Sequence, residues 1–155
     1  MEKPKPIKRH EALQPLSRQH HFGLLFSWKI RKGFAKEVSI SRMKAYADWF
    51  FEKEIQPHFK LEEEFVFPVL GNDDPLIERA LKEHREIKEL FEDAEEPSKS
   101  LQILEEKLTD HIRFEERTLF NRIQEVASKS EIEKIDEIHL QISTREEYTD
   151  AFWEN

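Results

Sequence analysis

Apolar residues recur every three or four positions over long stretches of this chain, with charged residues between them, as in amphipathic helices. A first helix is predicted from about Pro15, because proline is favoured in a first turn, to a stop at Gly33. A second helix is predicted after a serine cap at Ser39 or Ser41 and ends before Pro68.

Proline also marks the interior of the second helix and the start of a third. Pro57 should kink or split the second helix, because proline removes one backbone hydrogen bond and crowds the preceding turn. The third helix is predicted from Pro75, directly after Asp74, to about Glu96.

Two more helices follow in the pattern. The fourth is predicted from Ser98 or Ser100 to about Ala127. The segment SEIEKIDEIHLQI, residues 130–142, is a shorter fifth helix that is expected to pack on the outside of the first four. Its isoleucines have helical spacing: Ile132, Ile135, Ile138 and Ile142.

Composition supports an all-α fold. The chain has 155 residues, enough for one domain with its own core, and combines 37% charged residues with only 3 glycines. Three short connections between four long helices predict an up-down-up-down four-helix bundle with an additional short C-terminal helix. We expect a flexible tail over residues 1–9, the bundle domain over 10–127, and a C-terminal helix and tail over 128–155 that pack on the bundle.

Charge and residue usage exclude several classes of function. A net charge of -8 argues against nucleic acid as a partner, because phosphate binding needs a concentrated basic surface. No apolar run has the length of a signal-peptide core or a membrane span, so no membrane partner is expected. The chain has no cysteine, which excludes disulfides and thiolate chemistry and fits a cytoplasmic location.

Two stretches of the chain nearly repeat each other. HFKLEEEFVFPVL begins at His58 and HIRFEERTLFNRI begins at His111, and each has a Phe nine residues after the His. Each stretch places an imidazole and a carboxylate one helical turn apart, His58 with Glu62 and His111 with Glu115. A lone HxxxE is weak evidence in a chain so rich in Glu, but the matching context gives the pair weight.

Helix lengths place these groups at similar depths. At 1.5 Å per residue, Glu62 lies roughly 12 Å before the Gly71 turn, and His84 roughly 14 Å after Pro75. His84 also lies roughly 18 Å before the Pro97 turn, and His111 roughly 20 Å after it. Together with a histidine on the first helix, these groups could surround a pair of metal ions.

The first helix offers two adjacent histidines. His20 lies almost opposite Arg18, Lys29 and Lys32 on the helical wheel, whereas His21 lies nearer this charged side. His21 nevertheless has apolar neighbours at the spacings that a buried imidazole would need. The wheel favours His20 and leaves His21 as the alternative.

The order of these residues, a His, an HxxxE, a His and a second HxxxE on successive helices, resembles the hemerythrin-like, or HHE cation-binding, family. The similarity runs from residue 10 to about 125. It implies a four-helix bundle around two non-haem iron ions joined by an oxo or hydroxo bridge and by two glutamates. The metal ligands that it implies are His58, Glu62, His84, His111 and Glu115, with His20 or His21 from the first helix.

Two departures from the oxygen carriers of this family narrow the expectation. The carriers have a further His one turn after the ligand of the third helix, where this chain has Lys88, and their fourth helix ends its motif in a more distant Asp. Ferritin-like di-iron proteins use the reverse order, Glu-x-x-His, and more carboxylates. The wider HHE group therefore fits this chain better than a carrier or a ferroxidase.

Three functions follow. The first is a di-iron protein that binds or senses dioxygen, nitric oxide or the iron and redox state. The second is a di-iron oxidoreductase that reduces dioxygen, peroxide or nitric oxide with an outside electron donor, and the third is a metal-stabilised module that binds another protein. We expect a binding or sensing protein more than an enzyme, with its oligomeric state, including a homodimer, left open. Further carboxylates, Glu63, Glu64 and Glu116, are expected on solvated faces, where one could hydrogen-bond an imidazole from outside.

Overall fold

The computed structural model describes residues 8–139 and 147–154, and every regular element among them is helical. The all-α prediction is confirmed. In chain order the elements are η1 Glu11–Leu13, α1 Gln14–Ala35, α2 Ile40–Phe50, η2 Phe51–Ile55, α3 Gln56–Leu61, η3 Glu62–Val66, η4 Phe67–Val69, α4 Pro75–Glu92, α5 Pro97–Phe114, η5 Glu115–Leu119, α6 Phe120–Val126 and α7 Lys129–His139.

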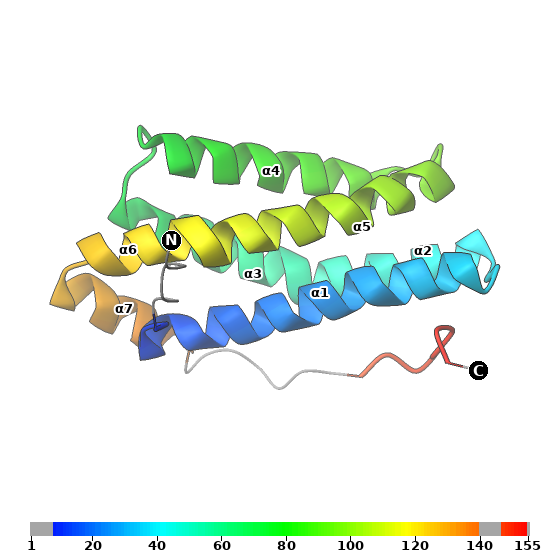
Figure 1. Ribbon diagram of the computed structural model, residues 1–155, viewed down its shortest axis with the longest axis horizontal. Coiled ribbons are helices and arrows are strands. Elements are labelled where there is room, and N and C mark those ends of the chain that lie inside the picture. Colours follow the sequence, from blue (N-terminus) through cyan, green and yellow to red (C-terminus); the bar gives the residue numbers. More distant parts are fainter. Residues whose placement is uncertain (1–7, 140–146, 155) are drawn as a thin grey trace, which may run out of the picture.

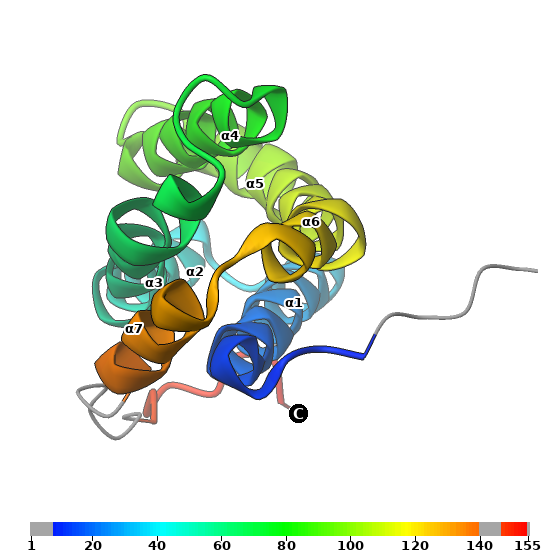
Figure 2. The same ribbon diagram turned by 90° about the vertical axis from the view of Figure 1, so that its left-hand side faces the viewer.

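The long helical stretches lie side by side along the longest axis of the molecule (Figure 1). α1 packs along α5, and α5 packs along α4, while the stretch from α2 to η4 completes the group (Figure 2). α7 packs against η1 and η3 at one end of this helical bundle. No helix in the described ranges is both long and apolar enough to cross a membrane.

Helix ends follow local capping chemistry. α4 begins at the predicted Pro75, and the side chain of Asp74 accepts a hydrogen bond from the backbone N–H of Leu76 at 2.8 Å. α4 ends at Glu92, four residues before the predicted end. The Asp93 carboxylate accepts hydrogen bonds from the backbone N–H groups of Glu95 and Glu96, in the connection to α5. α7 extends to His139, and the predicted end at residue 142 falls outside the described residues.

The chain passes Pro57 without a break in helical structure. The π-helical segment η2 lies directly before α3, and the N–H of Gln56 bonds to the carbonyl of Phe51, five residues back. Two further π-helical segments begin at Glu62 and Glu115, which are equivalent positions of the sequence repeat. π-helical turns are rare and concentrate at functional sites, so their recurrence points to these two glutamates.

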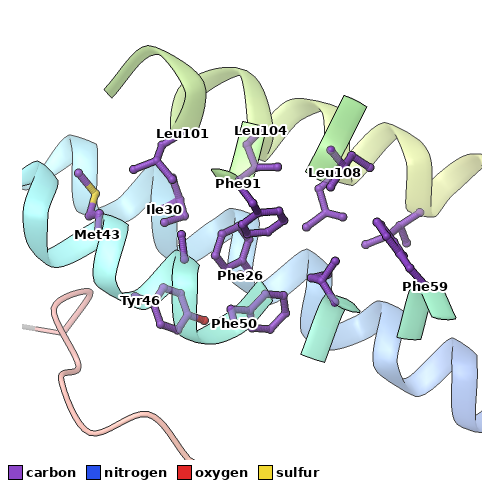
Figure 3. Close-up of a cluster of buried hydrophobic side chains, with 14 of the residues drawn as sticks. Phe26, Ile30, Met43, Tyr46, Phe50, Phe59, Phe91, Leu101, Leu104 and Leu108 are labelled. Carbon is purple, nitrogen blue, oxygen red and sulfur yellow. The ribbon is translucent and has the colours of Figure 1, made fainter. Parts of the chain in front are cut away.

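The apolar core is interrupted by a buried polar layer. One cluster includes Phe26, Phe50 and Phe91, and Figure 3 shows it running from Met43 to Phe59. A second cluster gathers around η1, η4 and α6. Buried histidines and glutamates lie close to where the helices pass from one cluster to the other, as His20 does between Leu16 and Phe26 and His84 between Ala80 and Ile87. They need compensating partners because a desolvated charge is costly.

Gly23 allows α1 and α5 to approach each other closely beside this layer. A Cβ atom at this position would lie 2.6 Å from Cδ1 of Ile112. A glycine within a helix costs roughly 1 kcal/mol relative to alanine, so close helix packing accounts for its presence at this position.

The C-terminal segment 147–154 packs against α1 and α2 beside Tyr46. Its rings Tyr148, Phe152 and Trp153 each lie 5.0–5.4 Å from the Tyr46 ring, centroid to centroid. Arg42 binds the Asp150 carboxylate with two hydrogen bonds of 3.1 and 2.6 Å. The segment thus covers the end of the bundle that is formed by the α1–α2 connection.

This packing predicts that Phe152→Ala lowers the free energy of unfolding by about 2–4 kcal/mol, because Phe152 is 3% exposed and its removal leaves a cavity beside Met43. Chemical denaturation of the purified variant measures the change. Val126→Ala, at a position that is 43% exposed, is the control and should shift stability by less than about 0.5 kcal/mol. Equal stabilities for the two variants would show that the segment does not stabilise the bundle.

Candidate metal centre

Six of the predicted site residues meet in the polar layer of the bundle. Each is at most 5% exposed, and together they come from all of the long helical stretches. α1 supplies one histidine, α3 and η3 a histidine and a glutamate, α4 one histidine, and α5 and η5 a histidine and a glutamate: His20, His58, Glu62, His84, His111 and Glu115.

His21 is the predicted site residue that the structure places elsewhere. Its side chain is exposed, and its ring lies 5.7 Å from that of Phe22 on the outer side of α1. Of the two adjacent histidines, only His20, the one that the helical wheel favoured, turns toward the bundle interior.

The six side chains form two ligand groups that share both glutamates. The first group is His20, His58, Glu62 and Glu115, and the second is Glu62, His84, His111 and Glu115. Within each group, one nitrogen or oxygen from every residue lies within 4.8 Å of the others. Two carboxylates between two pairs of imidazoles match the arrangement in which each carboxylate spans two cations.

Most buried polar atoms in the centre point toward a common interior without an aligned partner, although the Nε2 atoms of His20 and His58 lie 3.1 Å apart. Both oxygens of Glu62 and of Glu115 lack a hydrogen-bond partner, as do the Nε2 atoms of His84 and His111. Nε2 of His111 lies only 2.6 Å from Oε1 of Glu115, yet the two are not aligned as donor and acceptor. Because unpaired buried carboxylates are strongly unfavourable, this donor set fits cations.

The outer nitrogen of every imidazole is held by a different side chain. Nδ1 of His20 donates to Glu116 at 3.0 Å, and Nδ1 of His84 donates to Glu63 at 2.9 Å. These bonds fix the tautomer that leaves Nε2 free to face inward, as metal-binding histidines require.

The other two imidazoles are held in the same way. Nδ1 of His58 donates to the amide oxygen of Gln19 at 2.6 Å, and Nδ1 of His111 donates to Glu83 at 2.7 Å. We call the four bonds the outer ring, since each runs between neighbouring helical stretches: α1 to α3, η3 to α4, α4 to α5, and η5 back to α1.

Sequence reasoning found only part of the outer ring. Glu63 and Glu64 are exposed as predicted, and Glu116 is half-buried. One of the three was expected to be able to bond an imidazole, and two of them do, Glu63 and Glu116. Gln19 and Glu83 were missed altogether. A sequence signal exists, because every outer-ring residue is the direct neighbour of a residue in the centre, but it bonds an imidazole on another helix.

The Phe residues of the sequence repeat cover the centre from one side. Phe67 lies 5.3 Å from the ring of His84, and Phe120 stacks on His20 at 5.2 Å. Phe59 is labelled at the right-hand end of the cluster in Figure 3. Its ring stacks on the ring of His84 from the other side of the centre, with the two centroids 3.6 Å apart. These rings keep water away from the ligand atoms and lower the local dielectric.

The pKa values of the two central glutamates shift in opposite directions, and so do those of His58 and His111. Burial and the neighbouring charge of Glu115 raise the pKa of Glu62 well above its usual value, whereas His111 holds the pKa of Glu115 well below its own, against the effect of burial. Burial and His20 lower the pKa of His58. Burial also lowers that of His111, but Glu115 and Glu83 outweigh it and raise the pKa to about 9.

A small cavity of about 10 Å³ lies beside His20 and His58, near the minimum volume that holds one water molecule. Gln19, Gly23 and Glu54 also line it. Lys88, where oxygen carriers have another imidazole, is exposed on α4 and takes no part in the centre; its ammonium group lies 3.9 Å from Glu92.

Comparison with known proteins agrees with this geometry. The family described as "Hemerythrin HHE cation binding domain" matches residues 16–123, a range that holds all six residues of the centre and the whole outer ring. No curated protein and no solved structure matches the chain at a significant level.

Cation binding at pH 7 should release protons. His111, with a pKa of about 9, carries a proton that a cation must displace, and the raised pKa of Glu62 favours release of a further one. Affinity should therefore rise with pH until His111 loses its proton near pH 9. Calorimetric titration in two buffers of different ionisation enthalpy counts the protons, and an equal heat in both buffers would contradict a protonated His111.

Proposed function

The chain belongs to the hemerythrin HHE cation-binding domain family, and we propose that its up-down-up-down bundle holds two non-haem iron ions, one in each ligand group. The proposed role is to bind or sense dioxygen, nitric oxide or the cellular redox state. The observation that carries this proposal is the sharing of Glu62 and Glu115, each fully buried, between two four-residue ligand groups.

Iron is favoured by the donor set. Imidazole suits iron, zinc and copper, and carboxylate favours harder cations, so a mixed set of four imidazoles and two carboxylates suits iron. Iron in such a site supplies a reversible change of oxidation state and an open coordination position. Zinc offers no such redox change.

The residues of the chain have distinct tasks in this proposal. Glu62 and Glu115 each span both positions, and their negative charge offsets the repulsion between two cations. The imidazoles bind through Nε2, while the outer ring holds their orientation. Phe67 and Phe120 exclude bulk water.

The cavity beside His20 and His58 supports a small ligand. Its volume of about 10 Å³, near the minimum that holds one water molecule, is too small for an organic substrate and favours a ligand with at most about two non-hydrogen atoms. The proposed ligands are therefore dioxygen, nitric oxide or peroxide.

One observation favours the oxidoreductase as a second candidate. A groove of about 430 Å³ lies between α3 and α4, and Phe59 and His84 form part of its floor. Its lining includes three cations, Lys60, Arg85 and Lys88, and two carboxylates, Glu63 and Glu64, so it has a small excess of positive charge on a chain whose net charge is -8. An acidic electron donor docked there would be separated from the centre by one imidazole.

The proposal predicts about two iron ions per chain after anaerobic loading with ferrous iron. Glu62→Ala and Glu115→Ala should each lose most of the metal, since each carboxylate serves both positions. Glu64→Ala, an exposed carboxylate with no contact to the centre, is the matched control and should keep both ions. Elemental analysis gives the count, and one ion per chain in the unaltered protein would refute the two-ion centre.

The exposed Lys88 predicts the response to dioxygen. With one neutral nitrogen donor fewer than a carrier, the reduced protein should be oxidised within seconds to minutes in air and should not return to the reduced state under vacuum. Stopped-flow absorption after mixing with oxygenated buffer follows the change. Recovery of the original spectrum after dioxygen is removed would contradict this prediction and would support a carrier of dioxygen.

A further inference from the structure

The two ligand groups of the candidate metal centre correspond to each other residue for residue. His58, Glu62, Glu63 and Phe67 correspond to His111, Glu115, Glu116 and Phe120 in the sequence repeat. The correspondence extends to the lone histidines, because Gln19–His20 and Glu83–His84 make equivalent contacts: the residue before each histidine bonds the imidazole of the HxxxE pair in the same ligand group.

One outer-ring contact breaks this correspondence. Three imidazoles donate to carboxylates, Glu116, Glu63 and Glu83, whereas His58 donates to the neutral amide of Gln19. The group of His84 and His111 therefore has two outer carboxylates, and the group of His20 and His58 has one.

Nearby cations increase the difference in negative charge between the surroundings of the two ligand groups. Arg9 lies 3.2 Å from Glu116, and the Arg9 side chain is only 15% exposed, so it offsets the one outer carboxylate of the first group. Arg79 pairs with Glu83 at 3.0 Å but is 55% exposed, and solvent screens its charge more strongly. No cation of the described residues pairs with Glu63, whose charge therefore acts on His84 and Glu62 without a paired cation, although its side chain is 43% exposed and solvent screens it in part.

A carboxylate that accepts from Nδ1 makes Nε2 a stronger donor to a metal than an amide does, because it stabilises the positive charge that coordination places on the ring. Loss of such a partner typically weakens metal binding by 10–100-fold. The two positions should therefore differ in affinity even though their direct ligands are the same.

We propose that Gln19 is a positioning residue that makes the two metal positions unequal, so that the position of His84 and His111 fills first and that of His20 and His58 fills second. The inference rests on the proposed two-ion function. The expected gap between the two dissociation constants is about 10–100-fold.

A charge-neutral swap tests this order directly. Zn²⁺, a diamagnetic probe, is titrated into protein labelled with ¹⁵N-histidine, and the ring resonances report which imidazoles bind the first equivalent. In the unaltered protein His84 and His111 should respond first. In the double variant Gln19→Glu with Glu83→Gln, which keeps the net charge, His20 and His58 should respond first.

Single variants keep the test decisive if the swap does not fold. Gln19→Glu should tighten the second dissociation constant by about 10-fold or more, and Glu83→Gln should weaken the first by a similar factor. Glu64→Gln, which removes an exposed charge near the centre without touching an imidazole, should change neither constant by more than about 2-fold.

The outcomes separate the two proposals. Two bound ions whose order and constants do not respond to residues 19 and 83 overturn the inference and leave the two-ion centre in place. Uptake of a single ion at saturation overturns the proposed function, and the inference with it.

Discussion

Two carboxylates without hydrogen-bond partners at the centre of a helical bundle are the constraint on which the rest of this structure depends. Glu62 and Glu115 are fully buried, and neither has a partner that neutralises it through an aligned hydrogen bond. Protonated His111 offsets the charge of Glu115, and burial beside Glu115 raises the pKa of Glu62; with both carboxylates ionised, the pair needs further positive charge between the two side chains. The four imidazoles, with their inward Nε2 atoms, define where that charge can lie.

The outer ring transmits this constraint to the helices. Each of its four bonds connects neighbouring helical stretches, so the register of the bundle and the orientation of the imidazoles are fixed by the same contacts. Gly23 lets α1 and α5 approach, and the π-helical turns begin at the two central glutamates. Packing and site geometry are therefore coupled, and the apolar clusters on both sides hold the polar layer at a defined depth.

Much of this arrangement could be predicted because helices have a fixed rise and period. The HxxxE spacing puts His58 and Glu62 on one face, and the count of residues from each turn brings Glu62, His84 and His111 to one level. The helical wheel separates His20 from His21 for the same reason. These predictions need only geometry within a single helix.

Contacts between helices could not be derived in that way. Gln19 and Glu83 bond imidazoles on other stretches, and the direction of each bond depends on the rotation of one helix against the next. The end of α4 depends on the side chain of Asp93, and the place of the C-terminal rings depends on Tyr46.

The most direct measurement of the two-ion centre is anomalous diffraction at the iron absorption edge from crystals of the anaerobically loaded protein. We expect two peaks between Glu62 and Glu115, one beside His20 and His58 and the other beside His84 and His111; a single peak, or peaks only at exposed carboxylates, would contradict the account.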